Sequence, residues 1–139
     1  MAETMQFDLV SPERRLTSVR AREIRIPGSQ GEMTVMPGHA PVITTLKPGV
    51  LKVTGEGGET EFVVTGGFAE VTADSCTVLA ERSVGRGDMT QAIYSEMVAE
   101  VRARQEAETT ANMAGPTDEL VKLMADMVAL GGHIGLEPH

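Results

Sequence analysis

Hydrophobic and polar residues alternate over roughly the first 87 positions, in short runs that are separated by turn-forming residues. Met5, Phe7 and Leu9 fall on one face of a first strand, because side chains in a strand point alternately to its two faces. Turn residues recur every 8 to 12 positions, which is typical of a β-sandwich or barrel. Further candidate strands are Glu32–Met36, Val42–Leu46, Gly49–Thr54, Glu59–Val64, Phe68–Thr72 and Thr77–Ala80.

A second strand is expected from Val19 to Ile26, ending at Pro27-Gly28. Its apolar register changes near Glu23, which indicates a β-bulge there. Gly55-Glu56-Gly57-Gly58 and Ala73-Asp74-Ser75 have the composition of hairpin turns.

The hydrophobic period then changes from two to about 3.6 residues, which predicts a long helix. Apolar side chains recur at every fourth position, and three alanines extend the same stripe. Asp88 followed by Gln91 resembles a capping box at its start, and the helix is expected to end before Gly115-Pro116. These stripe residues are Met89, Ile93, Met97, Val101, Ala103, Ala107 and Ala111.

A second helix is expected to begin after Thr117, whose side chain can cap it, and to end at Gly131-Gly132. Its apolar stripe is Leu120, Leu123, Met124 and Met127. A short Gly-Pro connection between two helices predicts an antiparallel pair. The expected fold is therefore β plus α: an N-terminal antiparallel β-sandwich over residues 1–87, followed by a C-terminal antiparallel α-helical hairpin over residues 88–139.

The charge of the chain argues against nucleic acid as a partner, and it differs between the two halves of the sequence. The chain carries a formal charge of −8, with −2 on residues 1–87 and −6 on residues 88–139. Nucleic acid is not an expected partner, because phosphate binding requires a cationic surface. No apolar run approaches the roughly 18 residues of a membrane span, so membrane association is expected only through another protein. Met1-Ala2-Glu3-Thr4 does not resemble a signal segment.

Candidate catalytic and metal-binding residues are few. His39, His133 and His139 lack the spacing of metal ligands, so neither a metal nor another cofactor is expected. The single Cys76 sits in a strand-like run and is interpreted as a core residue rather than a nucleophile. Gly66-Gly67 is interpreted as a turn or bulge rather than a phosphate loop, and Glu59 with Glu61 as a solvated surface.

The most distinctive stretch runs from Gly28 to Pro41, where Pro37, Gly38 and Pro41 surround His39. Proline fixes the backbone, so a stiff loop is expected. It is either a recognition surface or a tight connection in which His39 bonds to nearby backbone.

This loop and several other motifs resemble the epsilon subunit family of F-type ATP synthases. The motifs occur in order through the first 87 residues. They are Leu9-Val10-Ser11-Pro12-Glu13, Gly31-Glu32, Pro37-Gly38-His39-Ala40-Pro41, Leu46-Lys47-Pro48-Gly49, Gly66-Gly67-Phe68-Ala69-Glu70-Val71 and Thr77-Val78-Leu79-Ala80-Glu81.

The resemblance implies a non-catalytic rotor subunit of the central stalk, bound to the gamma subunit and to the membrane-embedded c-ring. Its place would be peripheral, on the cytoplasmic side of a bacterial inner membrane. The residues implied to face the c-ring are Gln30, Gly31 and Glu32. Those implied to lie near gamma are Ser11, Pro37, Gly38, His39 and Thr44.

The helical half departs from the family's pattern. Some relatives bind ATP through an Asp and an Arg at the start of the first helix, where Thr90 and Ile93 stand in this sequence. No specific nucleotide binding is therefore expected. In relatives the hairpin can also extend toward the alpha and beta subunits. The −6 charge of this hairpin opposes such an insertion, because catalytic-head segments that receive it are expected to be acidic.

Two alternatives from other classes remain. One is a free-standing adaptor domain that uses the His39 loop for an unrelated partner. The other is an enzyme built on Cys76 and His39.

Overall fold

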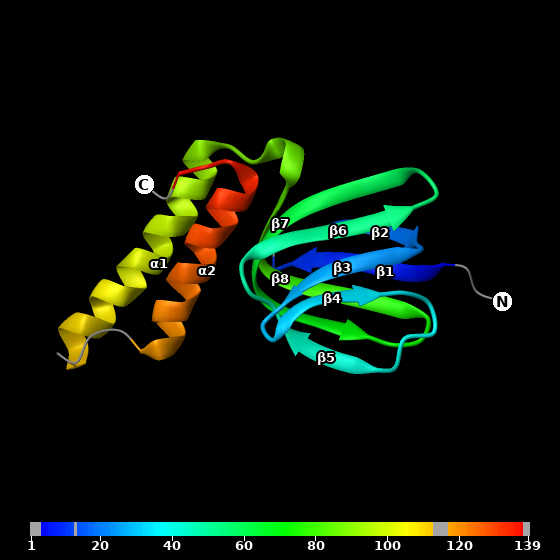
Figure 1. The fold of residues 1–139 in the computed structure, drawn as a ribbon, viewed down its shortest axis with the longest axis horizontal. Coiled ribbons are helices and arrows are strands. Elements are labelled where there is room, and N and C mark those ends of the chain that lie inside the picture. The colour runs from blue at the N-terminus through cyan, green and yellow to red at the C-terminus, as the bar shows by residue number, and fades with distance from the viewer. Residues whose placement is uncertain (1–3, 13, 113–116, 138–139) are drawn as a thin grey trace. The chain divides into compact units, whose positions relative to one another are not determined.

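The structure is a computed structural model that describes residues 4–12, 14–112 and 117–137. The chain divides into two compact units, Met1–Gly87 and Asp88–His139. All eight strands belong to the first unit and both α-helices to the second (Figure 1). The predicted class, a β-sandwich followed by a helical hairpin, is confirmed.

The strands form one continuous hydrogen-bonded path in the order β2-β1-β8-β7-β6-β3-β4, and β5 pairs with β7 beside it. Every pair is antiparallel except β1 with β8, which is parallel. The strands are β1 Met5–Ser11, β2 Arg14–Ala21, β3 Glu23–Gly28, β4 Gly31–Val35, β5 Val42–Thr45, β6 Gly49–Gly55, β7 Gly58–Val71 and β8 Ser75–Gly85.

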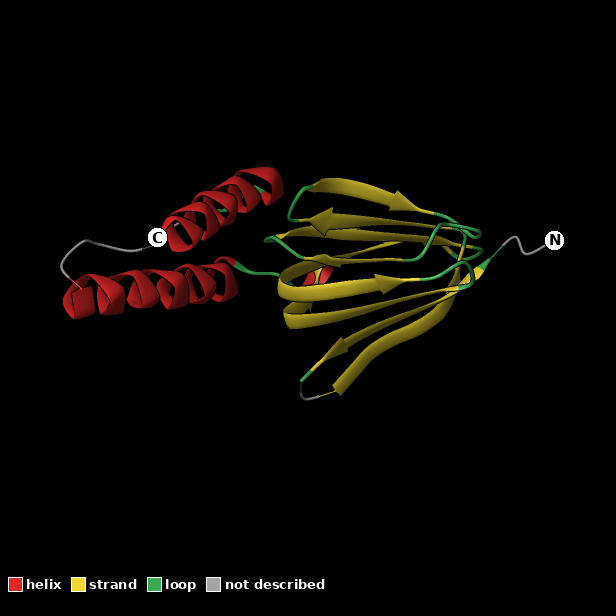
Figure 2. Ribbon diagram, turned by 90° about the horizontal axis from the view of Figure 1, so that it is seen from below, coloured by secondary structure: helices red, strands yellow, loops and turns green. Residues whose placement is uncertain are grey.

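The long β7–β8 hairpin belongs to both layers of the sandwich. Residues 58–64 of β7 pair with β6, whereas residues 68–71 pair with β5. The N-terminal part of β8 pairs with β1. We call β2, β1, β5 and the paired parts of β7 and β8 nearest the turn between them the first sheet. The second sheet consists of β4, β3, β6 and the remaining parts of β7 and β8. Figure 2 shows the two layers.

The hairpin bends from one sheet to the other at Gly66-Gly67. The ladder between β7 and β8 runs through Thr65 opposite Arg82 and resumes at Gly67 opposite Ala80. Gly66 and Gly67 have φ angles of 66° and 93°, a region that favours glycine. Beyond the bend, the Gly67 carbonyl accepts a bond from the Leu46 N–H at 3.0 Å. The bulge reading of these glycines is therefore right.

The core lies between the two sheets, as alternation predicts. Met5, Phe7 and Leu9 are all fully buried on the inner face of β1, which confirms the first predicted face. The rest of the cluster is contributed by β2, β3, β4, β6, β7, β8 and Leu46. It consists of Ala21, Ile24, Ile26, Val35, Leu46, Leu51, Val53, Val64, Ala69, Val71, Cys76, Val78 and Ala80.

Two strand predictions were wrong in their boundaries. The expected bulged strand from Val19 to Ile26 is two strands that break at Arg22, because β2 pairs with β1 whereas β3 pairs with β4 and β6. The two strands expected on either side of Gly66-Gly67 are the single strand β7. Both hairpin turns are confirmed: Gly55 pairs with Gly58, and the Thr72 N–H bonds the Ser75 carbonyl across the second turn.

The second unit consists of α1 Gln91–Asn112 and α2 Asp118–Ile134, with the 3-10 turn η1 Arg86–Asp88 before them. Contacts of Tyr94 with Met127 and of Gln105 with Leu120 show that the helices run antiparallel. The buried residues of the pair are Tyr94, Met97, Val98, Val101, Leu120, Met127, Leu130 and Gly131.

The start and the face of α1 differ from the prediction. Thr90 rather than Asp88 caps the helix, because its Oγ1 accepts a bond from the Ile93 N–H at 3.2 Å. The expected alanine stripe does not face α2, since Ala103 and Ala107 are exposed. A strict four-residue repeat drifts around a helix of 3.6 residues per turn, so the buried face moves to Tyr94 and Val98. The predicted end at Gly115-Pro116 lies outside the described residues.

Thr117 caps α2 as predicted, accepting a bond from the Leu120 N–H at 3.3 Å. The predicted stop at Gly131-Gly132 was wrong, because α2 continues to Ile134 and ends at Gly135, whose φ is 76°. Gly131 is instead a buried contact residue that lies against the Tyr94 ring.

Gly67→Ala should strongly destabilise the sandwich, because the added Cβ would overlap the Leu79 carbonyl. The alanine would also have to adopt a φ angle that disfavours every residue but glycine. We expect a loss of about 1–3 kcal/mol from backbone strain alone, measured by urea unfolding of the full chain. Gly57→Ala is the matched control, since nothing lies within 4 Å of its Cβ position. Equal stability of the two variants would contradict this account of the bend.

Candidate partner-binding surface

The residues implied to face a c-ring lie at the β3–β4 hairpin: Gln30 is in the turn, and Gly31 and Glu32 begin β4. Gln30 and Glu32 are exposed. The turn is held to the end of β5 by the Ser29 N–H, which donates to the Thr45 carbonyl at 2.9 Å, and by the two side-chain hydroxyls at 2.6 Å. Gln30, Gly31 and Glu32 are therefore presented by a turn that is anchored on two strands.

The His39 loop is bound to the backbone around it. The Gly38 N–H donates to the Ala73 carbonyl at 2.7 Å, which joins the loop to the β7–β8 turn. The His39 N–H donates to the Met36 carbonyl at 3.1 Å, and His39 Nδ1 donates to the Ala40 carbonyl at 2.7 Å. Local backbone bonding of His39, one of the two interpretations of this loop, is thus what the structure contains.

The residues implied to lie near gamma are not gathered into one cluster. Ser11 ends β1, Thr44 lies in β5, and Pro37, Gly38 and His39 precede β5. Leu9 pairs with Val78, Val78 with Ala69, and Ala69 with Thr44, so these four residues are aligned across the first sheet. Strands β8 and β7 therefore lie between β1 and β5. These residues therefore lie toward opposite margins of the same sheet.

The region between those margins carries an exposed apolar surface that the sequence analysis did not single out. Phe68 of β7 pairs with Leu79 of β8 on the outer face, where the two side chains are 39% and 38% exposed. On the other side of Leu79 its partner in β1 is the half-buried Val10. Ile43 is 68% exposed and lies diagonally to Phe68 across the β5–β7 pair. We call Val10, Ile43, Phe68 and Leu79 the outer apolar row. Its signal was the unbroken apolar character of Val78-Leu79-Ala80, because a strand with one solvated face should alternate.

Acidic side chains accompany the outer apolar row. Asp8, Thr77 and Glu70 are paired with one another at the level of Ile43, on the same face as the rest of the outer apolar row. The bases of this sheet, Arg15 and Arg20 among the described side chains, lie on its edge strand β2. The middle of the face is therefore apolar and acidic.

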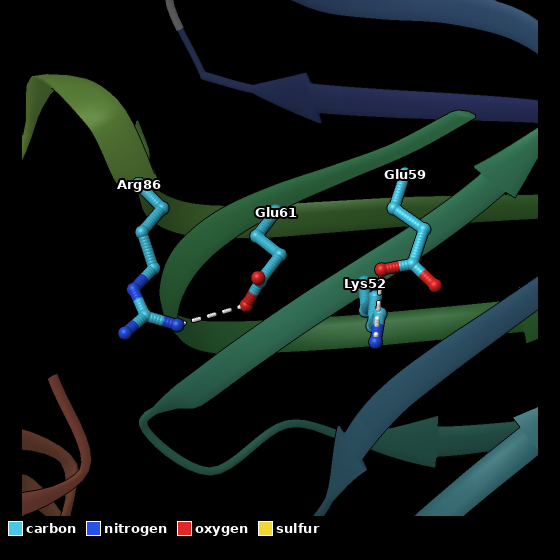
Figure 3. Close-up of polar contacts among 4 residues, drawn as sticks. All are labelled: Lys52, Glu59, Glu61 and Arg86. Carbon is cyan, nitrogen blue, oxygen red and sulfur yellow. Dashed lines mark hydrogen bonds and ion pairs between the residues drawn. The ribbon is translucent and has the colours of Figure 1, made fainter. Parts of the chain in front are cut away.

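The outer face of the second sheet carries paired charges instead (Figure 3). Lys52 Nζ lies 3.1 Å from Glu59 Oε2, and Arg86 Nη1 lies 2.9 Å from Glu61 Oε2. All four side chains are partly exposed, so each pair contributes at most about 1 kcal/mol. The two glutamates, interpreted as a solvated surface, are thus partly exposed residues that each have a cationic partner.

Cys76 lies in the core rather than in a reactive setting. Its side chain is fully buried between the sheets. Burial raises the pKa of the Cys76 thiol to about 12. A thiol needs its ionised form to act as a nucleophile, so this cysteine is unreactive in the folded chain.

His133 lies in α2, and His139 lies outside the described residues. In the described part of the chain, no three His, Cys, Asp or Glu side chains are close enough together to hold a metal ion. Thr90 is used as the helix cap of α1, and Ile93 is half-buried in its first turn.

A family model matches the sandwich and decides the family. Residues 4–85 match the model described as ATP synthase, Delta/Epsilon chain, beta-sandwich domain. The epsilon chain of Paracoccus denitrificans is 57% identical over all of this chain and 96% of its own length. The chain belongs to the ATP synthase epsilon chain family. The epsilon chain of Rhodobacter capsulatus is 54% identical over 98% of this chain and 100% of its own length.

Solved structures support the fold of this epsilon-family chain. A chain of the Euglena gracilis mitochondrial ATP synthase, in a structure of OSCP, F1 and c-ring, matches with a TM-score of 0.68. That match covers 97% of this chain and 81% of the other at 20% identity. A chain of the Tetrahymena thermophila mitochondrial ATP synthase central stalk and c-ring matches with a TM-score of 0.51 at 20% identity, covering 60% of this chain and 68% of the other. At these identities the likeness concerns the fold.

Neither α1 nor α2, as far as their residues are described, is long and apolar enough to cross a bilayer.

The raised pKa of Cys76 should make stability depend on pH. The unfolded thiol ionises near its ordinary pKa of 9.0, whereas the folded thiol keeps its proton to about pH 12. The stabilisation is therefore complete below pH 9 and falls between pH 9 and 12, by up to about 1.4 kcal/mol per pH unit. Cys76→Ala should show a shallower decline over this range in urea unfolding. Parallel slopes for the two chains would show that the thiol is not protected.

Proposed function

We propose that this epsilon-family chain is a non-catalytic rotor subunit of the F-type ATP synthase central stalk, which passes c-ring rotation to the catalytic head through gamma. Its family supports this, since the matched solved structures are described as containing F1 and the c-ring in one case and the central stalk and c-ring in the other. Torque transfer requires a stiff body with two anchored surfaces. A sandwich suits this task because its strands are cross-bonded and its core is close-packed.

The observation that carries the proposal is the outer apolar row. Phe68, Leu79 and Ile43 are large apolar side chains that a rigid sheet presents side by side. Contiguous exposed apolar surface marks protein–protein contacts, and aromatic residues often dominate their energetics. The row with its neighbouring acids Asp8 and Glu70 fits a partner surface that is apolar at its centre and basic around it.

Gamma is the proposed partner on the first sheet. Two residues assigned to gamma by the family resemblance come from strands on either side of the outer apolar row: Ser11 ends β1, and Thr44 lies in β5 next to the exposed Ile43. Pro37, Gly38 and His39 extend this surface at one end of β5. The row supplies buried contact area in this arrangement, and the flanking polar residues fix the register of docking.

The c-ring is the proposed partner of the β3–β4 turn. Gln30 and Glu32 are exposed there, and the carboxylate can pair with a basic or amide side chain of a ring loop. Through this contact the chain is peripheral on the cytoplasmic side of a bacterial inner membrane. The acidic hairpin stays folded in this proposal, and any contact with the alpha and beta subunits is made through it.

The absence of a catalytic role is part of the proposal. It is supported by the burial of Cys76, by the bonding of His39 to local backbone, and by the ion pairs that hold Glu59 and Glu61.

Phe68→Ala should weaken the complex with gamma. Truncating a central aromatic contact costs about 2 kcal/mol, which raises Kd by about thirtyfold. The measurement is co-expression with the gamma subunit from the same genome, size-exclusion chromatography of the complex, and titration of the purified chains. A complex that persists after removal of residues 88–139 would place binding in the sandwich.

Val121→Ala is the control, because Val121 is a 52% exposed apolar residue of α2 outside the outer apolar row. It should leave Kd unchanged. Failure of the unsubstituted chain to bind folded gamma would favour an adaptor that shares only the fold. An equal loss for both variants would assign the effect to general surface apolarity.

Glu32→Ala should have only a small effect on association with the c-ring. An exposed ion pair contributes about 0–1 kcal/mol, so the Kd should rise by no more than about fivefold. Pull-down of the rotor complex with detergent-solubilised c-ring measures this. Complete loss of association would show that one carboxylate, rather than a distributed surface, makes the contact.

A further inference from the structure

A pair of reciprocal hydrogen bonds joins the start of α1 to the chain beyond α2. Gln91 Nε2 donates to the Glu137 carbonyl at 2.6 Å, and the Glu137 N–H donates to Gln91 Oε1 at 3.0 Å. One side-chain amide thus satisfies both backbone polar groups of one residue, as a neighbouring strand would. The contact uses the backbone of Glu137 and does not depend on its carboxylate.

The turn that ends α2 brings Glu137 to this position. Gly135 takes a left-handed conformation, and both its N–H and the Leu136 N–H donate to the Gly131 carbonyl. Such a turn reverses the chain at a helix end. Residues 135–137 therefore return toward the first turn of α1, where Gln91 is located.

A second contact lies one turn further along α1. Tyr94 is fully buried, and its hydroxyl donates to the Met127 carbonyl at 2.8 Å. Gly131 leaves room for the ring, because a Cβ there would overlap the Tyr94 hydroxyl and lie 2.9 Å from the Leu136 carbonyl. Desolvation by burial raises the pKa of Tyr94, partly offset by its bond to the Gly131 backbone, so the hydroxyl remains a donor.

The two contacts share the same turn. Leu136, whose N–H binds the Gly131 carbonyl, directly precedes Glu137, and Gly131 lies against Tyr94. Gln91 and Tyr94 are three residues apart and lie on one face of α1. Displacing Glu137 therefore disturbs the residues that cover the Tyr94 hydroxyl.

We propose that Gln91, Tyr94, Met127, Gly131 and Glu137 form a C-terminal clasp that keeps the helical hairpin closed. The clasp lies where α1 begins and α2 ends, far from the connection between the helices. Free helix ends fray most easily, so a clasp at this place controls whether α2 separates from α1. The inference concerns the hairpin alone and does not rest on the proposed function.

Two hydrogen bonds also join the chain at the other end of the pair. Gln105 Nε2 donates to the Leu120 carbonyl at 3.3 Å, and Glu108 Oε2 accepts from the Thr117 N–H at 2.7 Å. There the short covalent connection already limits how far the helices can separate. The clasp supplies the corresponding restraint where the chain provides none.

Amide hydrogen exchange of the full chain, read residue by residue by NMR at pH 7, tests the clasp. Gln91→Ala removes the reciprocal pair, and Tyr94→Phe removes one hydroxyl while keeping the ring. Each lost hydrogen bond should speed exchange of the α2 amides from Met127 to Ile134 by about fivefold. The double variant should fall short of the product of the two single effects, because the contacts act together.

Lys122→Ala is the matched control. Lys122 pairs with Asp126 at 2.7 Å within α2, an exposed ion pair that lies outside the clasp, so exchange from Met127 to Ile134 should stay within about twofold. The clasp is overturned if Gln91→Ala speeds only the Glu137 amide. It is equally overturned if Tyr94→Phe leaves α2 unchanged, or if either variant speeds exchange in the sandwich as much as in α2.

Discussion

The bend of the β7–β8 hairpin is the constraint on which the rest of the sandwich depends. Because Gly66 and Gly67 turn two paired strands together, the same hairpin supplies paired positions to both sheets. The core residues on its inner faces then pack with Phe7, Leu9 and Leu51 in one cluster between the two sheets. This arrangement also sets the first sheet's outer face, since Phe68 and Leu79 meet just beyond the bend. The stiff body and its proposed docking surface therefore have one origin.

Much of the fold could be predicted from local sequence. Strict alternation at Met5, Phe7 and Leu9 identified a core face, and Thr117 before an apolar stripe identified the start of α2. The failures share a cause. The break at Arg22 and the continuity of β7 through two glycines depend on which strands pair, and pairing is not visible in a short window of sequence. Gly131-Gly132 looked like a helix end, but a buried tyrosine on the other helix requires the small residue there.

The candidate surface was less predictable than the fold. Resemblance pointed to Ser11, His39 and Thr44, which the structure places toward two margins of one sheet. The outer apolar row between them was missed, because its members come from four strands whose pairing is not visible in a short window of sequence. Cys76 shows the opposite case, since a lone cysteine within an apolar run was correctly interpreted as a core residue. The burial of a single residue can be predicted from the local sequence pattern. A surface that combines several strands can be predicted only when the registers in which those strands pair are known.

The parallel pairing of β1 with β8 has a consequence for how the chain acquires this fold. Leu9 stands beside Val78, 69 positions later, and the strand pairings of β1 among the described residues are with β8 and with its own hairpin partner β2. Closing so long a loop lowers the entropy of the chain before the contact forms. Sheets with many pairs that are distant in sequence therefore fold slowly. Strand β1 can therefore gain its pairing with β8 only after the segment between them has been brought into place. Before β8 has paired with β1, the apolar face of the β1–β2 hairpin remains exposed to solvent.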